Sequence, residues 1–330
     1  MRRRPRAAPL LAALLLLPLG VAEVAAQPAA PARVKVAGIE GTPQLFPMHV
    51  MQTKGIAEKH RLQIEQTRAA GVQGLYTILQ TGEFHVAFGG WLSIALLRSA
   101  GQKLTNIYSL SRYANDVMVP MASPLKSFAD LKGKRLGVFG GPTTTTTWFL
   151  RLQAVRFFGF DPVKEAKVNY GAAPLLMGML ERGELDAILS LDPQIVQMLE
   201  TGKFRSIGNL GEIWRTRTGQ DPLLVAVAVN EDWAQQNTAV VKRFVAAYRE
   251  ALEYLRTHPE VWPELARSVG IKTERGARLL RERSTFVSRW DQQFIDEQVA
   301  FAAEVVKTFG DAMGIPKRIP EGTFDLSYAR

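Results

Sequence analysis

The chain contains two similar stretches about 100 residues apart, and this internal repeat limits its fold more than any other feature. Residues 34–43 read as an apolar strand that ends in a Gly-Thr-Pro turn, and residues 134–143 as a strand that ends in Gly-Gly-Pro-Thr. Residues 82–88 and 183–189 each begin with Gly-Glu and continue as a further strand. Strands and helices in alternation favour a mainly parallel α/β sheet. We therefore predict two similar α/β lobes with a ligand cleft between them, since ligand sites favour such clefts.

The N-terminal segment is typical of an export signal. Four arginines precede the apolar residues 10–19, a run too short to span a bilayer, and the small residues 24–26 suit a cleavage site. We predict that residues 1–26 are a cleavable signal peptide; the alternatives are an uncleaved anchor or a mitochondrial presequence. The chain has no cysteine, which excludes disulfides and the lipid tether of a bacterial lipoprotein. We expect a soluble periplasmic protein that is not a lipoprotein.

The formal charge of +10 falls to +7 without the leader's four arginines and one glutamate. Such an excess favours anionic small ligands or membrane surfaces. The basic residues are scattered and the protein is predicted to be exported, so we expect no nucleic-acid partner.

The order of the predicted strands and helices divides the mature chain into two discontinuous lobes. Residues 117–120 and 223–229 read as the two crossings between them. The predicted limits are residues 33–120 with 221–330 for lobe 1, and residues 121–220 for lobe 2. The last hundred residues show helical periodicity, and we expect these helices to pack against lobe 1 rather than form a partner surface.

The sharpest local motif is Gly-Gly-Pro followed by five threonines and a tryptophan, at residues 140–148. Glycine permits a tight turn, proline suits the first helical turn, and a helix N-terminus favours an anion or a polar acceptor. Open α/β sheets bind ligands at the carboxyl ends of their strands, where this run lies. We favour a ligand-binding role for Thr143, Thr144 and Thr145 over a helix cap that faces solvent.

Other candidates also follow predicted strands. Thr42 occupies the matching place in the first copy, and Gly90 and Trp91 follow the third strand. Singly, each aromatic side chain is more often packing than ligand contact, but as a group they indicate an amphipathic cleft. That group comprises Phe46, Trp91, Tyr113, Tyr170 and Trp214. Asp192 could accept a hydrogen bond from ligand or cap the helix that follows it.

Signatures of catalysis are missing from the sequence. The four histidines show no metal-ligand spacing, and there is no Gly-x-Ser-x-Gly elbow or phosphate loop. Asp192 with Tyr170 is the one acid–base pair that can be assembled. We predict no enzyme activity, no cofactor and no bound metal.

Four stretches resemble a known family. Residues 47–62, 82–87, 126–138 and 183–187 are similar to motifs of type II periplasmic solute-binding proteins, in the branch that binds nitrate, sulfonates, taurine and thiamine-type pyrimidines. The Asp-Leu-Lys-Gly-Lys-Arg-x-Gly-Val signature at residues 130–138 is the most specific of them. The sequence departs from the family at Arg61, where glycine is usual, and at His85-Val86, where Asp is common.

The resemblance implies a type II periplasmic binding protein fold of two mixed sheets flanked by helices, with a hinge of two crossing segments. It implies these ligand contacts: Thr42, Phe46, Gly90, Trp91, Tyr113, Thr143, Thr144, Thr145, Tyr170 and Asp192. No cationic cluster occupies the cleft positions, so a sulfonate would depend on amides and hydroxyls.

The function predicted from the sequence is that of a monomeric periplasmic receptor of an ABC importer. It would bind a small organic anion such as a sulfonate and deliver it to a membrane-embedded permease. The alternatives are a thiamine-type pyrimidine or another heteroaromatic ligand, a subunit that senses ligand for a membrane receptor, and an exported enzyme on the same fold.

Overall fold

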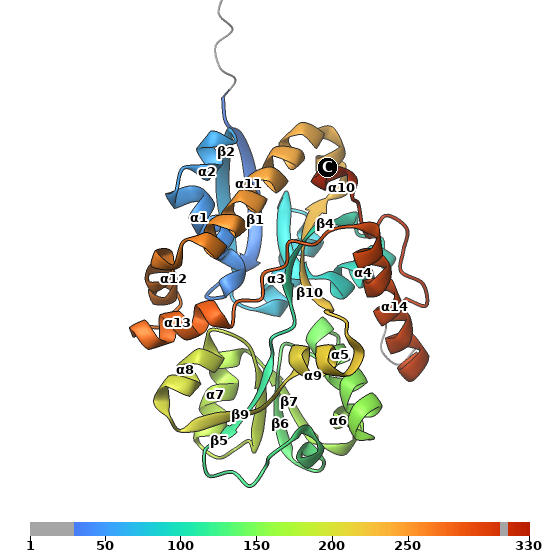
Figure 1. Ribbon diagram of the computed structural model, residues 1–330. Helices are drawn as coiled ribbons and strands as arrows, with labels where there is room; N and C mark the ends of the chain where they lie inside the picture. Colours follow the sequence, from blue (N-terminus) through green and yellow to red (C-terminus); the bar gives the residue numbers. More distant parts are fainter. Residues whose placement is uncertain (1–29, 311–315) are drawn as a thin grey trace, which may run out of the picture. The chain divides into compact units, whose positions relative to one another are not determined.

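The computed structural model describes residues 30–310 and 316–330, and residues 31–330 form one compact unit. The predicted signal peptide, residues 1–26, lies outside the described residues. Two five-stranded sheets organise the compact unit, one above the other in Figure 1. Both sheets mix parallel and antiparallel strands and are flanked by helices, which confirms the predicted α/β class.

The first sheet, sheet A, is built around β1, which pairs in parallel with β2 and β3. The fourth strand, β10, runs antiparallel to both of its neighbours. The strands lie in the order β2 (Leu62–Ala69), β1 (Ala32–Ile39), β3 (Val86–Gly90), β10 (Leu223–Asn230) and β4 (Leu104–Arg112). The buried, β-branched residues of β10 suit a central strand covered on both faces.

The second sheet, sheet B, repeats this arrangement. Its strand β6 pairs in parallel with β7 and β8, and β5 runs antiparallel to β8 and β9. The order is β7 (Lys167–Gly171), β6 (Arg135–Phe139), β8 (Ala187–Ser190), β5 (Asp116–Pro120) and β9 (Phe204–Asn209). Gly82 and Gly183, equivalent in the two copies, both adopt left-handed backbone with φ of 71° and 72°.

The chain passes between the sheets in both directions, so each sheet takes its fourth strand from the other half of the sequence. β5 directly follows β4 of sheet A, and β10 follows α9 (Leu210–Thr218) after the last strand of sheet B (Figure 1). Residues 117–120, interpreted from the sequence as a crossing, form most of β5 and pair within sheet B. The exact limits of the two lobes stay a prediction.

The helices that follow the strands cover the sheet faces. Those of the first half and the segment after β10 are α1 (Phe46–Thr53), α2 (Ile56–Lys59), α3 (Val72–Thr81), α4 (Trp91–Ser99), α10 (Glu231–Gln236) and α11 (Thr238–Thr257). Those of the second half are α5 (Thr145–Gln153), α6 (Pro162–Glu165), α7 (Ala173–Glu181) and α8 (Gln194–Thr201). A π-helical turn, Ala154–Phe158, extends α5.

The C-terminal region is helical, as its periodicity predicts, but it does not pack against the first half alone. It comprises α12 (Trp262–Ser268), α13 (Glu274–Glu282) and α14 (Gln292–Phe309). α11 joins the core of sheet A, whereas Phe301 of α14 packs against Phe149 and Trp214 with ring centroids 5.5 and 5.6 Å apart. The expectation that the C-terminal helices pack against lobe 1 is therefore wrong for α14, whose Phe301 joins a core cluster with aromatic side chains of the second half as well as residues of α4.

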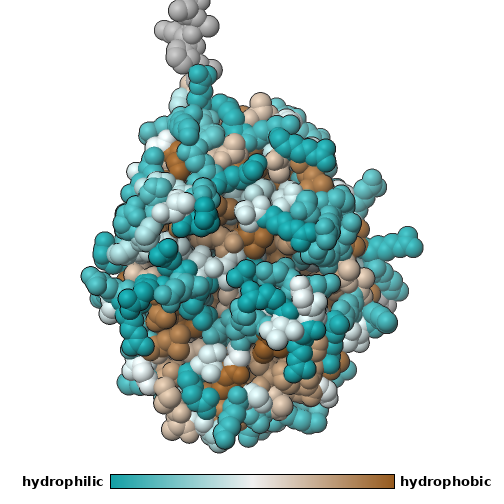
Figure 2. Space-filling view, in the orientation of Figure 1, coloured by the Kyte–Doolittle hydropathy of each residue, from teal (hydrophilic) through white to brown (hydrophobic). Residues whose placement is uncertain are grey.

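Polar side chains cover most of the face shown in Figure 2, and apolar side chains form patches between them. Within the described ranges, none of the helices has the length and apolar character that a membrane crossing requires.

Candidate ligand-binding site

Two adjoining cavities lie between the carboxyl ends of strands from both sheets. One, of about 70 Å³, extends from Thr42 to Arg283, and the other, of about 50 Å³, lies over the first turn of α5. They share four lining residues: Gln44, Asn115, Leu191 and Leu224. Apolar and aromatic side chains make up most of the remaining wall, with a few polar groups among them, which is the usual composition of a small-molecule site.

Asn115 is the central polar group of these cavities. The residue is only 1% exposed, and neither its side-chain amide nitrogen nor its amide oxygen has a hydrogen-bond partner. Its backbone carbonyl accepts a hydrogen bond from the Leu210 amide at 2.8 Å, which fixes the turn between β4 and β5. Gln44 adds a second buried amide oxygen without a partner. A buried, unpaired amide costs about 1–3 kcal/mol, so these groups are suited to a ligand that satisfies them.

The threonine run lies at the N-terminus of α5. The Thr144 hydroxyl donates to the Gly141 carbonyl at 3.0 Å and accepts from the Thr147 amide at 3.4 Å, so Thr144 is the N-cap. Thr144, Thr145 and Thr146 line the smaller cavity, where the first amides of α5 offer donors to a polar acceptor. Thr143 is exposed and lines neither cavity.

The two halves of the molecule meet at Thr145. Its hydroxyl lies 3.2 Å from the Ser93 hydroxyl of α4, and its carbonyl accepts a hydrogen bond from the Tyr113 hydroxyl at 2.9 Å. A Cβ atom on Gly90 would lie 2.5 Å from the Thr145 hydroxyl oxygen. Glycine at position 90 thus permits the close approach of β3 to α5.

An ion-pair network forms the opposite wall. Arg283, which directly follows α13, reaches to sheet B: its Nε lies 3.0 Å from Asp192 Oδ1 and its Nη2 3.1 Å from Asp116 Oδ1. Burial, countered in part by Arg283, raises the pKa of Asp192 to about 6. Burial also lowers the pKa of Arg283, but the two carboxylates outweigh it and hold that pKa above its usual range.

Each arginine of the cavity walls is paired with at least one carboxylate. Arg283 and Arg112 both line the larger cavity, and Arg112 pairs with Asp221 at 3.1 Å. No sequence pattern indicates that these two arginines lie at the cleft. In the smaller cavity, burial raises the pKa of Tyr76 to about 12, which leaves a neutral hydroxyl. The structure therefore offers amides, hydroxyls and neutralised charges to a ligand.

Comparison with known proteins assigns the chain to a family. A family model described as NMT1/THI5 like matches residues 42–261. The chain belongs to the NMT1/THI5-like family. The matched region begins within the first turn of the repeat, contains the second turn, Asn115 and Asp192, and ends before Arg283.

Individual relatives agree with this assignment. A protein of Haemophilus influenzae that carries the name of a thiamine biosynthesis protein is 26% identical to this chain over 219 residues. These residues are 64% of this chain and 66% of that protein. The fold matches the periplasmic aliphatic sulphonate-binding protein SsuA of Escherichia coli, with a TM-score of 0.71 at 18% identity over 89% of this chain and 96% of that one. The alkanesulfonate-binding SsuA of Xanthomonas axonopodis pv. citri, bound to MOPS, gives 0.74 at 16% identity over 91% and 100%.

Half of the site residues predicted from the sequence line the two inter-sheet cavities. Thr42, Gly90, Thr144, Thr145 and Asp192 do so. Asp192 is engaged by Arg283, and its carboxyl also faces the backbone amide of Val196 in the following helix, so the cap alternative holds in part.

The other half, most of it aromatic, lies outside both linings. Trp91 is fully buried in the core against Phe324, and Phe46 packs edge-on against Trp262. Tyr113 bonds Thr145 from within the core, Tyr170 has a buried hydroxyl without a partner, and Thr143 faces solvent. Trp214, expected near a loop, is fully buried in α9.

Sequence reasoning missed the residues that carry most of the site's chemistry. Gln44 and Asn115 each lie two residues from a predicted contact, Thr42 and Tyr113, so a wider search around each strand end would have found them. Arg283 gives no local signal, because 91 residues separate it from Asp192. The aromatic wall comes instead from Tyr76, Phe88 and Phe139.

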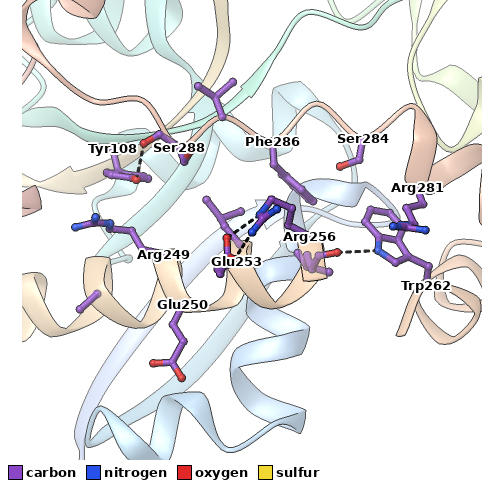
Figure 3. Close-up of a pocket in the computed structure, with 14 residues that line it drawn as sticks. Tyr108, Arg249, Glu250, Glu253, Arg256, Trp262, Arg281, Ser284, Phe286 and Ser288 are labelled. Carbon is purple, nitrogen blue, oxygen red and sulfur yellow. Dashed lines mark hydrogen bonds and ion pairs between the residues drawn. The ribbon is translucent and has the colours of Figure 1, made fainter. Parts of the chain in front are cut away.

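A larger groove lies elsewhere, between α11 and residues 281–288 (Figure 3). It measures about 740 Å³, and three arginines surround an apolar floor that includes Trp262 and Phe286. Arg256 is paired with Glu253, and the Trp262 indole donates to the Leu255 carbonyl at 3.0 Å. None of the described side chains that line it carries a buried polar atom without a partner. The inter-sheet cavities are therefore the better ligand site.

Metal chemistry receives no support from the described residues, where no group of three or more His, Cys, Asp or Glu side chains is placed to hold an ion.

Proposed function

We propose that this chain is the periplasmic ligand-binding component of an ABC importer and that it binds one small organic molecule between its two sheets. Its family membership and its likeness in fold to sulfonate-binding proteins support the general role. The observation that carries the proposal is Asn115, whose buried amide has two free hydrogen-bonding atoms on the wall shared by both cavities.

The chemistry of Asn115 favours the heteroaromatic ligand over the sulfonate. An amide presents one donor group and one acceptor, a pattern that pairs with a ring nitrogen beside an amino group, as Asn does with adenine. A sulfonate has acceptors only, so it would leave the Asn115 oxygen unpaired, and both arginines of the wall already hold carboxylates. Tyr76, Phe88 and Phe139 supply the apolar surface that a planar ring requires.

Binding acts through closure of the two lobes. The contacts of Thr145 with Ser93 and of Arg283 with Asp192 join opposite sides of the cavities. A ligand that satisfies Asn115 stabilises this joined state, and the hinge follows the two crossing segments. The closed monomer then docks on a membrane permease. The limits of lobe 1 and lobe 2 given above are part of this proposal.

We propose no turnover of the ligand. The one acid–base pair suggested by the sequence does not come together in either cavity, because Asp192 lines the larger one and Tyr170 lines neither. Asp192 is held by Arg283, and burial raises the pKa of Tyr170, which disfavours its anion.

The test compares ligands that differ in hydrogen-bonding pattern. The protein is unfolded and refolded to remove carried-over ligand, and calorimetry and thermal unfolding are then measured with 4-aminopyrimidines, aliphatic sulfonates, nitrate and aromatic carboxylates. A ligand at 100 times its Kd stabilises the fold by about 2.7 kcal/mol. We expect an aminopyrimidine to bind and to be recovered unchanged.

The matched variants are Asn115→Ala and Asn169→Ala, the latter at an exposed position of β7. Loss of a paired, buried amide costs about 1–3 kcal/mol, so Asn115→Ala weakens binding about 10- to 100-fold while Asn169→Ala has no effect. Binding that is unaffected by Asn115→Ala, or chemical conversion of the ligand, would contradict the proposed function.

A further inference from the structure

We propose that Asp192, which gives the ion-pair network of Arg283 and Asp116 a net negative charge, determines the charge selectivity of the cleft and prevents it from binding simple anions. The inference deepens the proposed function, because it concerns the same cavities. It is carried by the geometry of one guanidinium group that reaches across the cleft from α13 to sheet B.

All three nitrogens of Arg283 are engaged on the sheet B side. Nε bonds both oxygens of Asp192 at 3.0 and 3.1 Å, and Nη1 lies 3.2 Å from Asp116 Oδ2. Nη2 bonds Asp116 Oδ1 at 3.1 Å and contacts the Ala114 carbonyl at 3.4 Å. A guanidinium paired with two carboxylates has no unoccupied pair of N–H donors and no net positive charge with which to bind an anion.

The two carboxylates differ in their relation to the ligand. Asp192 lines the larger cavity together with Arg283, whereas Asp116 lies behind the wall, where it also accepts a hydrogen bond from the Asn209 amide group. The side chains of Arg283 and Asp192 are 19% and 10% exposed, so their charges are only weakly screened by water. Removing the charge of Asp192 therefore changes the field inside the cavity directly.

Arg112 provides an internal comparison. It also lines the larger cavity and pairs with a single carboxylate, that of Asp221. This pair is more exposed, with 33% and 40% of the two side chains accessible, so solvent screens its charges. If the charge of an arginine were sufficient, neutralising the carboxylate beside Arg112 would raise anion affinity as much as neutralising one beside Arg283. If the buried network determines selectivity, the effect at Arg112 would be smaller.

The experiment uses methanesulfonate and methanesulfonamide, two probes of the same shape, of which only the first carries a full charge. Affinities are measured at pH 8 and constant ionic strength for the wild type, Asp192→Asn, Asp221→Asn and the double variant Asp192→Asn/Arg283→Gln. Asparagine keeps an acceptor for Arg283 Nε, so the contact is preserved while the charge is lost. We expect Asp192→Asn to raise the affinity for methanesulfonate about tenfold or more relative to methanesulfonamide.

The same ratio is expected to change less than about threefold in Asp221→Asn and to return to the wild-type value in the double variant. An unchanged ratio in Asp192→Asn, an equal gain in Asp221→Asn, or a gain that survives in the double variant overturns the inference. Where Asp192→Asn fails to fold, Asp116→Asn removes one of the two carboxylates from the same guanidinium and is expected to shift the ratio in the same direction.

The two probes also differ in hydrogen-bond donors, but that difference is the same for every variant, so the change in their affinity ratio reports on charge and does not depend on the natural ligand. Failure to find any ligand among pyrimidines and sulfonates would count against the proposed function, whereas an unchanged probe ratio would count against the role of Asp192.

Discussion

The two halves of the repeat use the same turn after their first strand for different purposes. In the first half, the Thr42 hydroxyl donates to the Ile39 carbonyl at 2.8 Å and closes the turn, and the following helix buries Phe46 in the core. In the second half, Thr144 caps α5 and leaves the amides of that helix beside the cavity. The repeat thus forms the walls of the site, while each copy contributes different groups to it.

The charged wall has no counterpart in the repeat. It comes from Arg283, which follows α13 in the C-terminal region and reaches Asp116 and Asp192 of the second half. The shared architecture thus places the cleft, and the segment outside the repeat gives it its electrostatic character.

The largest loss of stability is expected from a substitution that removes the contact between the repeat and the C-terminal region. Trp214 is fully buried and packs against Phe149, with ring centroids 5.3 Å apart, and against Phe301 of α14. Trp214→Ala should lower the free energy of unfolding by about 3–5 kcal/mol. The control is Trp233→Ala, at a half-buried indole stacked on His85 in the first half, which should cost less. Urea denaturation measures both, and equal losses would mean that α14 does not depend on this cluster.

The next effect tests how the equivalent strands β1 and β6 differ in packing. Ala37 of β1 lies opposite Ala87, whereas Gly137 of β6 lies opposite Ile188. A Cβ on Gly137 would meet side-chain atoms of Leu185 and Ile188 at 2.8 and 2.9 Å. Gly137→Ala should therefore destabilise the protein by about 1–3 kcal/mol through overpacking, and Ala37→Gly by about 1 kcal/mol through backbone entropy. If Gly137→Ala instead stabilises the protein in urea denaturation, the side chains of Leu185 and Ile188 can move to accommodate a methyl group.

The third effect concerns the charged wall and depends on pH. Because the pKa of Asp192 is raised to about 6, the folded protein holds a proton that the unfolded chain releases near its ordinary value of 3.8. The stability that this group contributes is fully present below that ordinary value and is lost as the pH rises through about 6.

Between pH 4 and 7 the loss attributable to Asp192 should be about 1–3 kcal/mol, and Asp192→Asn should remove it. The measurement is the difference between the wild-type and variant free energies of unfolding over this pH range. Parallel curves would show that Asp192 titrates at an ordinary pKa.

The smallest effect compares the two turn threonines directly. Thr144→Ala removes the N-cap of α5 and should cost about 1 kcal/mol. Thr42→Ala removes one hydrogen bond to a carbonyl without a capping role, and we expect a loss of about 0.5 kcal/mol. Thermal unfolding of both variants without ligand shows which substitution costs more stability. A larger loss of stability in Thr42→Ala would contradict the roles assigned to the two turns.

Much of the fold could be predicted from local patterns. The apolar strands, the Gly-Glu signals and the turn glycines place most elements within a few residues, although β9 and α9 have no such signal and residues 117–120 form a strand of sheet B as well as a crossing. Arg61, noted as a departure from glycine, adopts a left-handed φ of 52°, so the family pattern identified a strained position that the structure contains. Half of the predicted contacts line the candidate cavities, and their role in binding stays a prediction.

The sequence by itself determined the two repeated α/β halves, the strand ends that face each other, and the turns that carry Thr42 and Thr144, because these depend on residues close together in the chain. Only the tertiary structure decided that Asn115 is buried without a partner, that Trp91 and Tyr113 belong to the core, and that Arg283 meets Asp116 and Asp192. The last contacts join residues 167 and 91 positions apart, and no local pattern encodes which distant charges meet once two sheets and a C-terminal helix have packed together.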